Sequence, residues 1–166
     1  MSDMSQAPRK RPIFLRILAI LSFVYVSLGL VANLGALFQG PFSPEEIDEI
    51  QADSYESIDQ LREMGYSDLS DVMESSLRIE QYVNDNIYEH SLLSVLVLLF
   101  GFYGVYLMFR GRRRGFHIYI IYSIMSAVLV YVSVPIGDVP LAFTLISLGI
   151  SALFVWMYSR NMHYMK

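Results

Sequence analysis

Residues 43–90 read SPEEIDEIQADSYESIDQLREMGYSDLSDVMESSLRIEQYVNDNIYEH and hold fourteen of the sixteen Asp and Glu residues of the 166-residue chain. Ten of the twelve Lys and Arg residues lie outside this stretch. Hydrophobic residues make up 54% of the whole sequence, which is more than a typical soluble domain contains. They concentrate on either side of the acidic stretch, so its position between apolar segments decides how the chain is organised.

Four long apolar segments surround the acidic stretch. They share a near absence of charge, with Arg16 as the one charged residue among them, and they cover residues 13–38, 92–109, 116–134 and 139–158. A helix needs about 20 apolar residues to cross roughly 30 Å of hydrocarbon. We therefore predict an all-α membrane protein in which four helices cross the membrane as an antiparallel bundle. The first segment is too long for the apolar core of a signal peptide, so we expect it to be retained.

Basic residues cluster at alternate ends of these segments, which orients the chain because Lys and Arg favour the cytoplasmic side. Both termini are therefore expected in the cytoplasm, and the acidic stretch outside it. The chain has no glycosylation sequon, which fits a bacterial inner membrane. The predicted division is cytoplasmic tail 1–12, span 13–38, extracytoplasmic acidic helical hairpin 39–91, span 92–109, basic loop 110–115, span 116–134, outer turn 135–138, span 139–158 and cytoplasmic tail 159–166.

The acidic stretch has the pattern of two amphipathic helices. Residues 43–46, Ser-Pro-Glu-Glu, form a capping box with proline at the first helical position, which predicts a helix start. Apolar residues then recur every three or four positions until Gly65, a typical helix end. A second pattern begins at Asp68, and no Gly or Pro interrupts it before Gly101. We therefore expect the second outer helix to run straight into the second span.

A stripe of carboxylates is predicted on the first outer helix. Its members lie close together on one face: Glu45, Glu49, Asp53 and Glu56. Like charges four residues apart cost about 0.2–0.5 kcal/mol per pair in an isolated helix. The stripe is either a solvated face that keeps the hairpin soluble, or a surface that binds divalent cations, a basic partner protein or a second copy of the chain.

Our leading hypothesis for function is non-enzymatic. The acidic hairpin would make the protein a docking or accessory subunit of a membrane complex. The alternative is a transport component in which the hairpin concentrates cations near a route through the bundle, lined by Asn33, serines and tyrosines.

The predicted spans lack the side chains that intramembrane chemistry usually needs. The chain has no Cys, which excludes disulfides and thiolate metal sites. His90 lies a full membrane away from His117 and His163, and His163 in the tail is a poor rigid ligand, so paired haem ligation is not expected. The serines have no base at their depth and are interpreted as packing residues, while Asn33 is expected to bond to another helix. We expect no enzyme, no cofactor, no metal and no nucleic-acid partner.

Aromatic residues, Tyr119 and Tyr122 among them, gather in the inner halves of the spans and are interpreted as an interfacial belt. Arginines beside such a belt can hold the headgroup of an anionic lipid. The candidate headgroup ligands are Arg110, Arg112, Arg113, Arg114 and Arg160.

Three stretches of the chain resemble a group of small bacterial four-span membrane proteins of unknown function. They are residues 11–23, which begin RPIFL and end ILSF, residues 115–119, GFHIY, and residues 161–166, NMHYMK. The resemblance implies a four-span fold and an inner-membrane location. It implies no activity and no catalytic residues.

Overall fold

The computed structural model describes residues 13–165, so the tail 1–12 and Lys166 lie outside the described residues. All regular elements within 13–165 are helical, which confirms the all-α class. Four helices of this range are long and apolar enough to span a membrane. They are α1 (Ile13–Gln39), α4 (Ile87–Phe109), α5 continued by α6 (Arg114–Ser133) and α7 (Leu141–Ser159).

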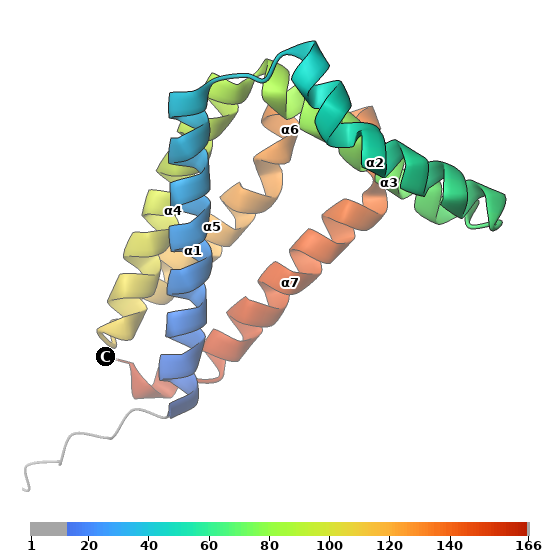
Figure 1. Cartoon of the computed structure of the whole chain (residues 1–166). Helices are drawn as coiled ribbons and strands as arrows, with labels where there is room; N and C mark the ends of the chain where they lie inside the picture. Colours follow the sequence, from blue (N-terminus) through green and yellow to red (C-terminus); the bar gives the residue numbers. More distant parts are fainter. Residues whose placement is uncertain (1–12, 166) are drawn as a thin grey trace, which may run out of the picture.

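Two further helices come between α1 and α4. These are α2 (Pro44–Glu63) and α3 (Ser67–Asp85), which we call the acidic helix pair. They lie side by side and project away from the four apolar helices (Figure 1). Shorter elements complete the chain: α6 (Val130–Ser133), η1 (Ile136–Asp138) and η2 (Met162–Tyr164).

The core of the apolar helices is centred on α4, which packs against both α1 and α5. Val26 of α1, Val105 of α4 and Tyr122 of α5 are among its buried residues. Glycines bring α4 and α5 together, because a Cβ atom on Gly115 would lie 2.6 Å from the carbonyl oxygen of Gly104. A bulkier residue at Gly115 would force the two main chains apart, because two of its nearest neighbours there are main-chain atoms of α4.

α7 is packed far less closely than the other apolar helices. Only 6% of its most apolar stretch is buried, against 39% for α4. It contacts α5. α1 and α7 are closest at the C-terminal end of α7, and they separate toward the helix pair (Figure 1). A space therefore opens between α1, α5 and α7.

The expectation that the second outer helix runs straight into the second span is wrong. The helix breaks at Asn86, where φ is −113° and ψ is 29°, and α3 and α4 run in different directions (Figure 1). The Asn86 side chain donates to the carbonyl of Tyr82, a local bond that competes with helix continuation. On the α3 side of the break, Ile79 packs with Val134 and Val139 of the turn before α7. This contact forms because α3 and α4 run in different directions.

Candidate functional site

The acidic helix pair begins with the capping box that the sequence predicts. The Ser43 hydroxyl accepts from the Glu46 amide at 3.3 Å, and the Glu46 carboxylate accepts from the Ser43 amide at 2.8 Å. These two bonds satisfy amides that the first helical turn leaves unpaired. α2 is therefore anchored next to the linker that leads from α1.

Gln51 of α2 makes a buried polar contact between the two helices. Its side chain is 3% exposed, and buried amides of this kind need hydrogen-bond partners. Its Nε2 donates to the Leu77 carbonyl and to the Glu80 carboxylate, both at 3.4 Å, while its Oε1 accepts from Gln81 at 3.2 Å. Gln51 thus fixes how α2 lies on α3 and holds the Glu80 carboxylate in place.

A groove of about 320 Å³ lies at the base of the helix pair, where the pair meets the apolar helices. Most of its wall is apolar, Ile50 is 59% exposed in it, and Glu80 contributes a carboxylate. The lining residues are Phe42, Ile47, Ile50, Gln51, Ile79, Glu80, Val83, Asn84 and Ile87. Asn84 secures one side, because its side chain accepts from the Phe42 amide at 2.8 Å and donates to the Phe42 carbonyl at 3.1 Å.

All four residues of the predicted carboxylate stripe are exposed: Glu45, Glu49, Asp53 and Glu56. None of them forms an ion pair within residues 13–165, since Arg62 pairs with Asp59 and Glu74 and Arg78 pairs with Glu74. Asp53 is three residues after Ile50 and so stands beside it on the helix surface. The other three lie farther round α2, away from the groove. None of the four stripe residues is among the described residues that line the groove, and Asp53 is the one that stands beside a lining residue, Ile50.

Glu80 is the groove carboxylate that sequence reasoning missed. It follows Ile79, a buried residue of the apolar face of α3. Its position next to a buried apolar residue could have indicated a carboxylate close to the contact between the helices. A search for acidic residues along one face of the first outer helix does not consider it. Only the packing of α3 on α2 places Glu80 next to Ile50.

The predicted headgroup ligands all lie at the opposite end of the apolar helices, and all are exposed: Arg110, Arg112, Arg113, Arg114 and Arg160. Two of them stack on aromatic rings, with the Arg110 guanidinium 5.8 Å from the Tyr106 ring and that of Arg160 5.4 Å from the Trp156 ring. Arg113 is partly engaged by the chain itself, because its Nε donates to the Met165 carbonyl at 2.9 Å.

The other polar residues of interest are distributed through the fold. His90 bonds to Ser133 of α6 at 2.9 Å, and the His117 ring lies 3.3 Å from the Arg113 carbonyl. The expectation that Asn33 bonds to another helix is wrong, because it donates to the Gly29 carbonyl one turn earlier in α1. No group of three or more His, Asp or Glu side chains in residues 13–165 could hold a metal ion.

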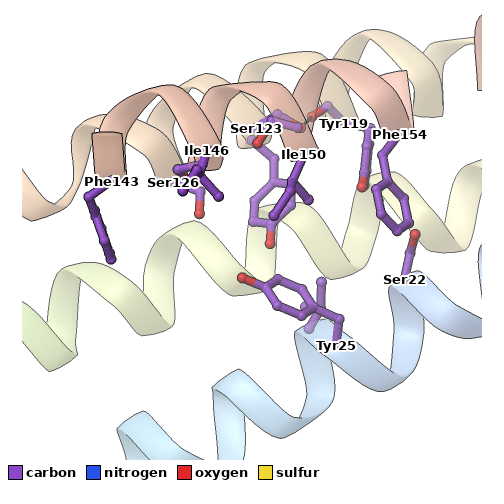
Figure 2. Close-up of a pocket in the computed structure, with 13 residues that line it drawn as sticks. Ser22, Tyr25, Tyr119, Ser123, Ser126, Phe143, Ile146, Ile150 and Phe154 are labelled. Atoms are coloured by element: carbon purple, nitrogen blue, oxygen red, sulfur yellow. Dashed lines mark hydrogen bonds between the residues drawn. The ribbon is translucent and has the colours of Figure 1, made fainter. Parts of the chain in front are cut away.

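A cavity of about 350 Å³ lies between α1, α5 and α7 (Figure 2). Serines that we interpreted as packing residues converge on it. Tyr119 and Tyr122, which we placed in an interfacial belt, are buried beside it. The hydroxyl-bearing lining residues are Ser22, Tyr25, Tyr119, Tyr122, Ser123, Ser126, Ser147 and Ser151, and the others are Val26, Phe143, Ile146, Ile150 and Phe154.

Comparison with known proteins assigns the chain to a family but gives it no activity. No curated protein and no solved structure matches it. A family model described as "Domain of unknown function (DUF8777)" matches residues 9–157, which is most of the chain. The chain therefore belongs to this family of proteins of unknown function.

Proposed function

We propose that the four apolar helices cross a bacterial inner membrane as an antiparallel bundle. The arginine-rich end would face the cytoplasm, with both termini, and the acidic helix pair would form an extracytoplasmic hairpin. The distribution of charge supports this orientation, because Lys and Arg collect on the cytoplasmic side of membrane proteins. Helices of 19 to 27 residues are also long enough to cross the hydrocarbon.

Within this topology, we propose that the protein is a non-enzymatic docking or accessory subunit whose acidic helix pair binds a basic partner. The groove at Ile50 is the observation that carries the proposal. It combines an exposed apolar surface with the Glu80 carboxylate, and Asp53 stands beside Ile50. Such a surface suits an amphipathic segment that inserts an apolar side chain between Lys or Arg residues.

Charge favours a different protein over a second copy of the helix pair as the partner. α2 and α3 contain thirteen Asp and Glu residues and two arginines, so two helix pairs would repel each other. A basic partner would instead relieve repulsion along the carboxylate stripe. The stripe would then contribute mainly to the rate and specificity of association, and the groove to its affinity.

Charge reversal tests the electrostatic part of the proposal. Changing Glu45, Glu49, Asp53 and Glu56 together to Lys should abolish co-purification of a partner from native membranes in mild detergent. The smaller double variant Glu49→Lys/Asp53→Lys should weaken it. Its matched control is Asp68→Lys/Asp71→Lys, which makes the same change of charge near the distal tip. Equal loss in both double variants would contradict a docking surface near the groove.

A matched pair of apolar residues tests the groove. Ile50 lies in the groove and is 59% exposed, while Leu69 lies near the tip of α3 and is 51% exposed. Ile50→Ser should reduce capture of the partner, and Leu69→Ser should leave it unchanged. If the two variants capture the partner equally well, the groove is not the binding surface.

A transport component remains the alternative proposal, and the cavity between α1, α5 and α7 gives it limited support. Serines and tyrosines line that cavity, but Asn33 does not, and no Asp, Glu, Lys, Arg or His does. A dehydrated cation would therefore meet no compensating charge. Cation flux into liposomes that contain the purified protein would favour transport over docking.

We also propose that the exposed arginines at the other end hold anionic lipid headgroups. The stacking of Arg110 on Tyr106 and of Arg160 on Trp156 supports this role, since it places cations beside interfacial rings. Arg112→Gln/Arg114→Gln should reduce the amount of phosphatidylglycerol that co-purifies with the protein. Unchanged lipid content would contradict the proposal.

A further inference from the structure

The cavity between α1, α5 and α7 is centred near one depth of the bundle. Ser22 is nine residues after the start of α1, Ser123 is nine residues after the start of α5, and Ile150 is nine residues before the end of α7. All three positions are counted from the same end of the bundle. Nine residues of helix correspond to about 14 Å, which is close to half the thickness of the hydrocarbon. In the proposed topology the cavity therefore lies near the middle of the membrane.

The lining residues differ in exposure in a way that locates the opening. Ser22 and Tyr122 are buried and form the floor, whereas Tyr25 of α1 is 67% exposed and Ile146 of α7 is 64% exposed. Figure 2 draws Tyr25 and Ile146 on the two helices that face each other across the space. α1 and α7 diverge here (Figure 1), so the cavity opens sideways between them. A ligand would enter from the hydrocarbon and not from the aqueous phases.

Two serines of the lining, both on α7, have hydroxyls without a hydrogen-bond partner within residues 13–165. The Ser22 hydroxyl bonds to that of Tyr158 at 2.9 Å, and Ser123 donates to the Tyr119 carbonyl at 2.9 Å. Ser147 and Ser151 line the cavity half-buried, and neither hydroxyl bonds to another residue of the described range 13–165. Helix serines usually donate to the carbonyl four residues earlier, as Ser123 does. An unpaired hydroxyl in hydrocarbon is costly, so these two donors suit a ligand acceptor.

We propose that this cavity binds a neutral lipid with a carbonyl-bearing ring, the chemistry of an isoprenoid quinone. The ligand is neutral because no charged side chain of residues 13–165 lines the cavity. Its carbonyl oxygens accept from Ser147 and Ser151. Its ring packs against aromatic side chains, of which the cavity has five: Tyr25, Tyr119, Tyr122, Phe143 and Phe154.

The position of the free hydroxyls distinguishes this ligand from a phospholipid. Ester carbonyls of phospholipids are held near the headgroups by the phosphate, about 15 Å from the middle of the membrane. A quinone ring has no charged group and can reach that depth. The cavity volume of about 350 Å³ is at the small end of ligand pockets, enough for the ring, while the tail leaves between α1 and α7.

The test uses the full-length protein in nanodiscs of phosphatidylcholine, with a benzoquinone that carries a decyl tail as the ligand. Trp156 of α7 is the single tryptophan, and quinones quench tryptophan fluorescence on close approach. Saturable quenching is expected, with dissociation constants confirmed by equilibrium partition of the quinone against protein-free nanodiscs. Quenching that rises linearly with quinone concentration, without saturation, would overturn the proposal.

Two variants of α7 and one control locate the site. Ser151→Phe fills the cavity and should weaken binding by more than about tenfold, whereas Ala152→Phe adds similar bulk at an exposed position outside the lining and should have no effect. Ser147→Ala/Ser151→Ala removes the two donors and should weaken binding about tenfold, as expected for two hydrogen bonds. The alanine variant decides the question if Ser151→Phe does not fold. Equal affinity in wild type and the alanine variant would overturn the proposal.

Competition identifies the ligand class. A second quinone with an isoprenoid tail should displace the decyl quinone, and oleate or added phosphatidylglycerol should not. Displacement by oleate at similar concentrations would overturn the proposal in favour of an acyl-chain site. The proposal is independent of the docking surface, so Ile50→Ser should leave quinone binding unchanged.

Discussion

α5 meets its two neighbouring helices in opposite ways. Toward α4, the close approach of Gly104 and Gly115 leaves no room for even one extra carbon atom. Toward α7, tyrosine and serine side chains surround a cavity of about 350 Å³. Residue size therefore decides which side of α5 is a closed interface and which side can admit a ligand.

α7 is nevertheless held in place on the open side of α5 by hydrogen bonds near both of its ends. At one end the Tyr158 hydroxyl bonds to Ser22 of α1 at 2.9 Å. At the other end Thr144 bonds to Tyr131 of α6, and Asp138 in the preceding turn accepts from Tyr82 of α3 at 3.0 Å. Hydrogen bonds near its ends, together with the packing of its last two turns on the core, position α7. The two sides of α5 should therefore respond differently to mutation.

Adding one carbon atom to the closed side should have the largest effect. Gly115→Ala would place its Cβ 2.6 Å from two main-chain atoms, the Gly104 oxygen and the Met108 nitrogen, which cannot move as a side chain can. We expect a loss of about 3 kcal/mol in the free energy of unfolding, at the upper end for overpacked interiors. Unfolding in mixtures of dodecylmaltoside and SDS would measure it.

Gly149→Ala is the matched control on the open side. No atom lies within 4 Å of a Cβ built on Gly149 of α7. Alanine is also the better helix former, so this variant should be neutral or slightly more stable. Equal destabilisation by the two substitutions would show that α7 is packed as tightly as α4.

Removal of the hydrogen bond between Ser22 and Tyr158 should have the next largest effect. Ser22→Ala leaves the hydroxyl of Tyr158, which is fully buried, without its partner. An unsatisfied buried hydroxyl costs about 1–3 kcal/mol. Tyr158→Phe removes both the group and the need for a partner, so it should cost less than Ser22→Ala. The reverse order would mean that the Ser22–Tyr158 bond does not hold α7.

Loss of the hydrogen bond between Thr144 and Tyr131, near the other end of α7, should reduce the free energy of unfolding less. Thr144→Val keeps the shape of the side chain and removes its bond to Tyr131, both half-buried. Hydrogen bonds between membrane helices contribute about 0.6 kcal/mol on average, and a loss of this size is expected. A double-mutant cycle with Tyr131→Phe checks it, because the two losses should not add. Additive losses would contradict a direct bond.

The closed side of α5 and the spans could be predicted from sequence more readily than the open side. Hydropathy identifies the apolar helices because each one contains its own signal. The start of α2 was predicted for the same reason, since the capping box at Ser43 is local. The cavity depends on where three helices meet, and the sequence has no signal for that position. The serines can be read from the sequence, but the cavity that they line together cannot.

The break at Asn86 and the role of Glu80 escaped prediction for a related reason. No Gly or Pro marks the break, which depends on contacts of Ile79 with the turn before α7. The place of Glu80 depends on how α3 lies across α2, and buried Gln51 fixes that arrangement. Sequence patterns describe one helix at a time, and both features belong to pairs of elements.

The smallest effect is expected for the hydrogen bond between Tyr82 and Asp138. The hydrogen bond to the Asp138 carboxylate, together with its negative charge, raises the pKa of Tyr82 above its ordinary value of 10.0. The folded protein therefore keeps this tyrosine neutral at a pH where the unfolded chain ionises it. The stabilisation from this contact is complete below about pH 10 and is lost as the pH rises through the raised pKa.

Tyr82→Phe tests this sign directly. Below pH 10 the variant should unfold slightly more easily than wild type, and above pH 10 the difference should shrink, because the contact is then lost in wild type as well. Tyr66→Phe, at the exposed turn between α2 and α3, should follow wild type at every pH. A difference between Tyr82→Phe and wild type that stays constant through pH 11 would mean that Asp138 does not hold the Tyr82 hydroxyl. The helix pair would then contact the turn before α7 through the apolar parts of Ile79, Tyr82 and Val83. A partner bound to the pair would then have no polar link within residues 13–165 through which to shift the open side of α5.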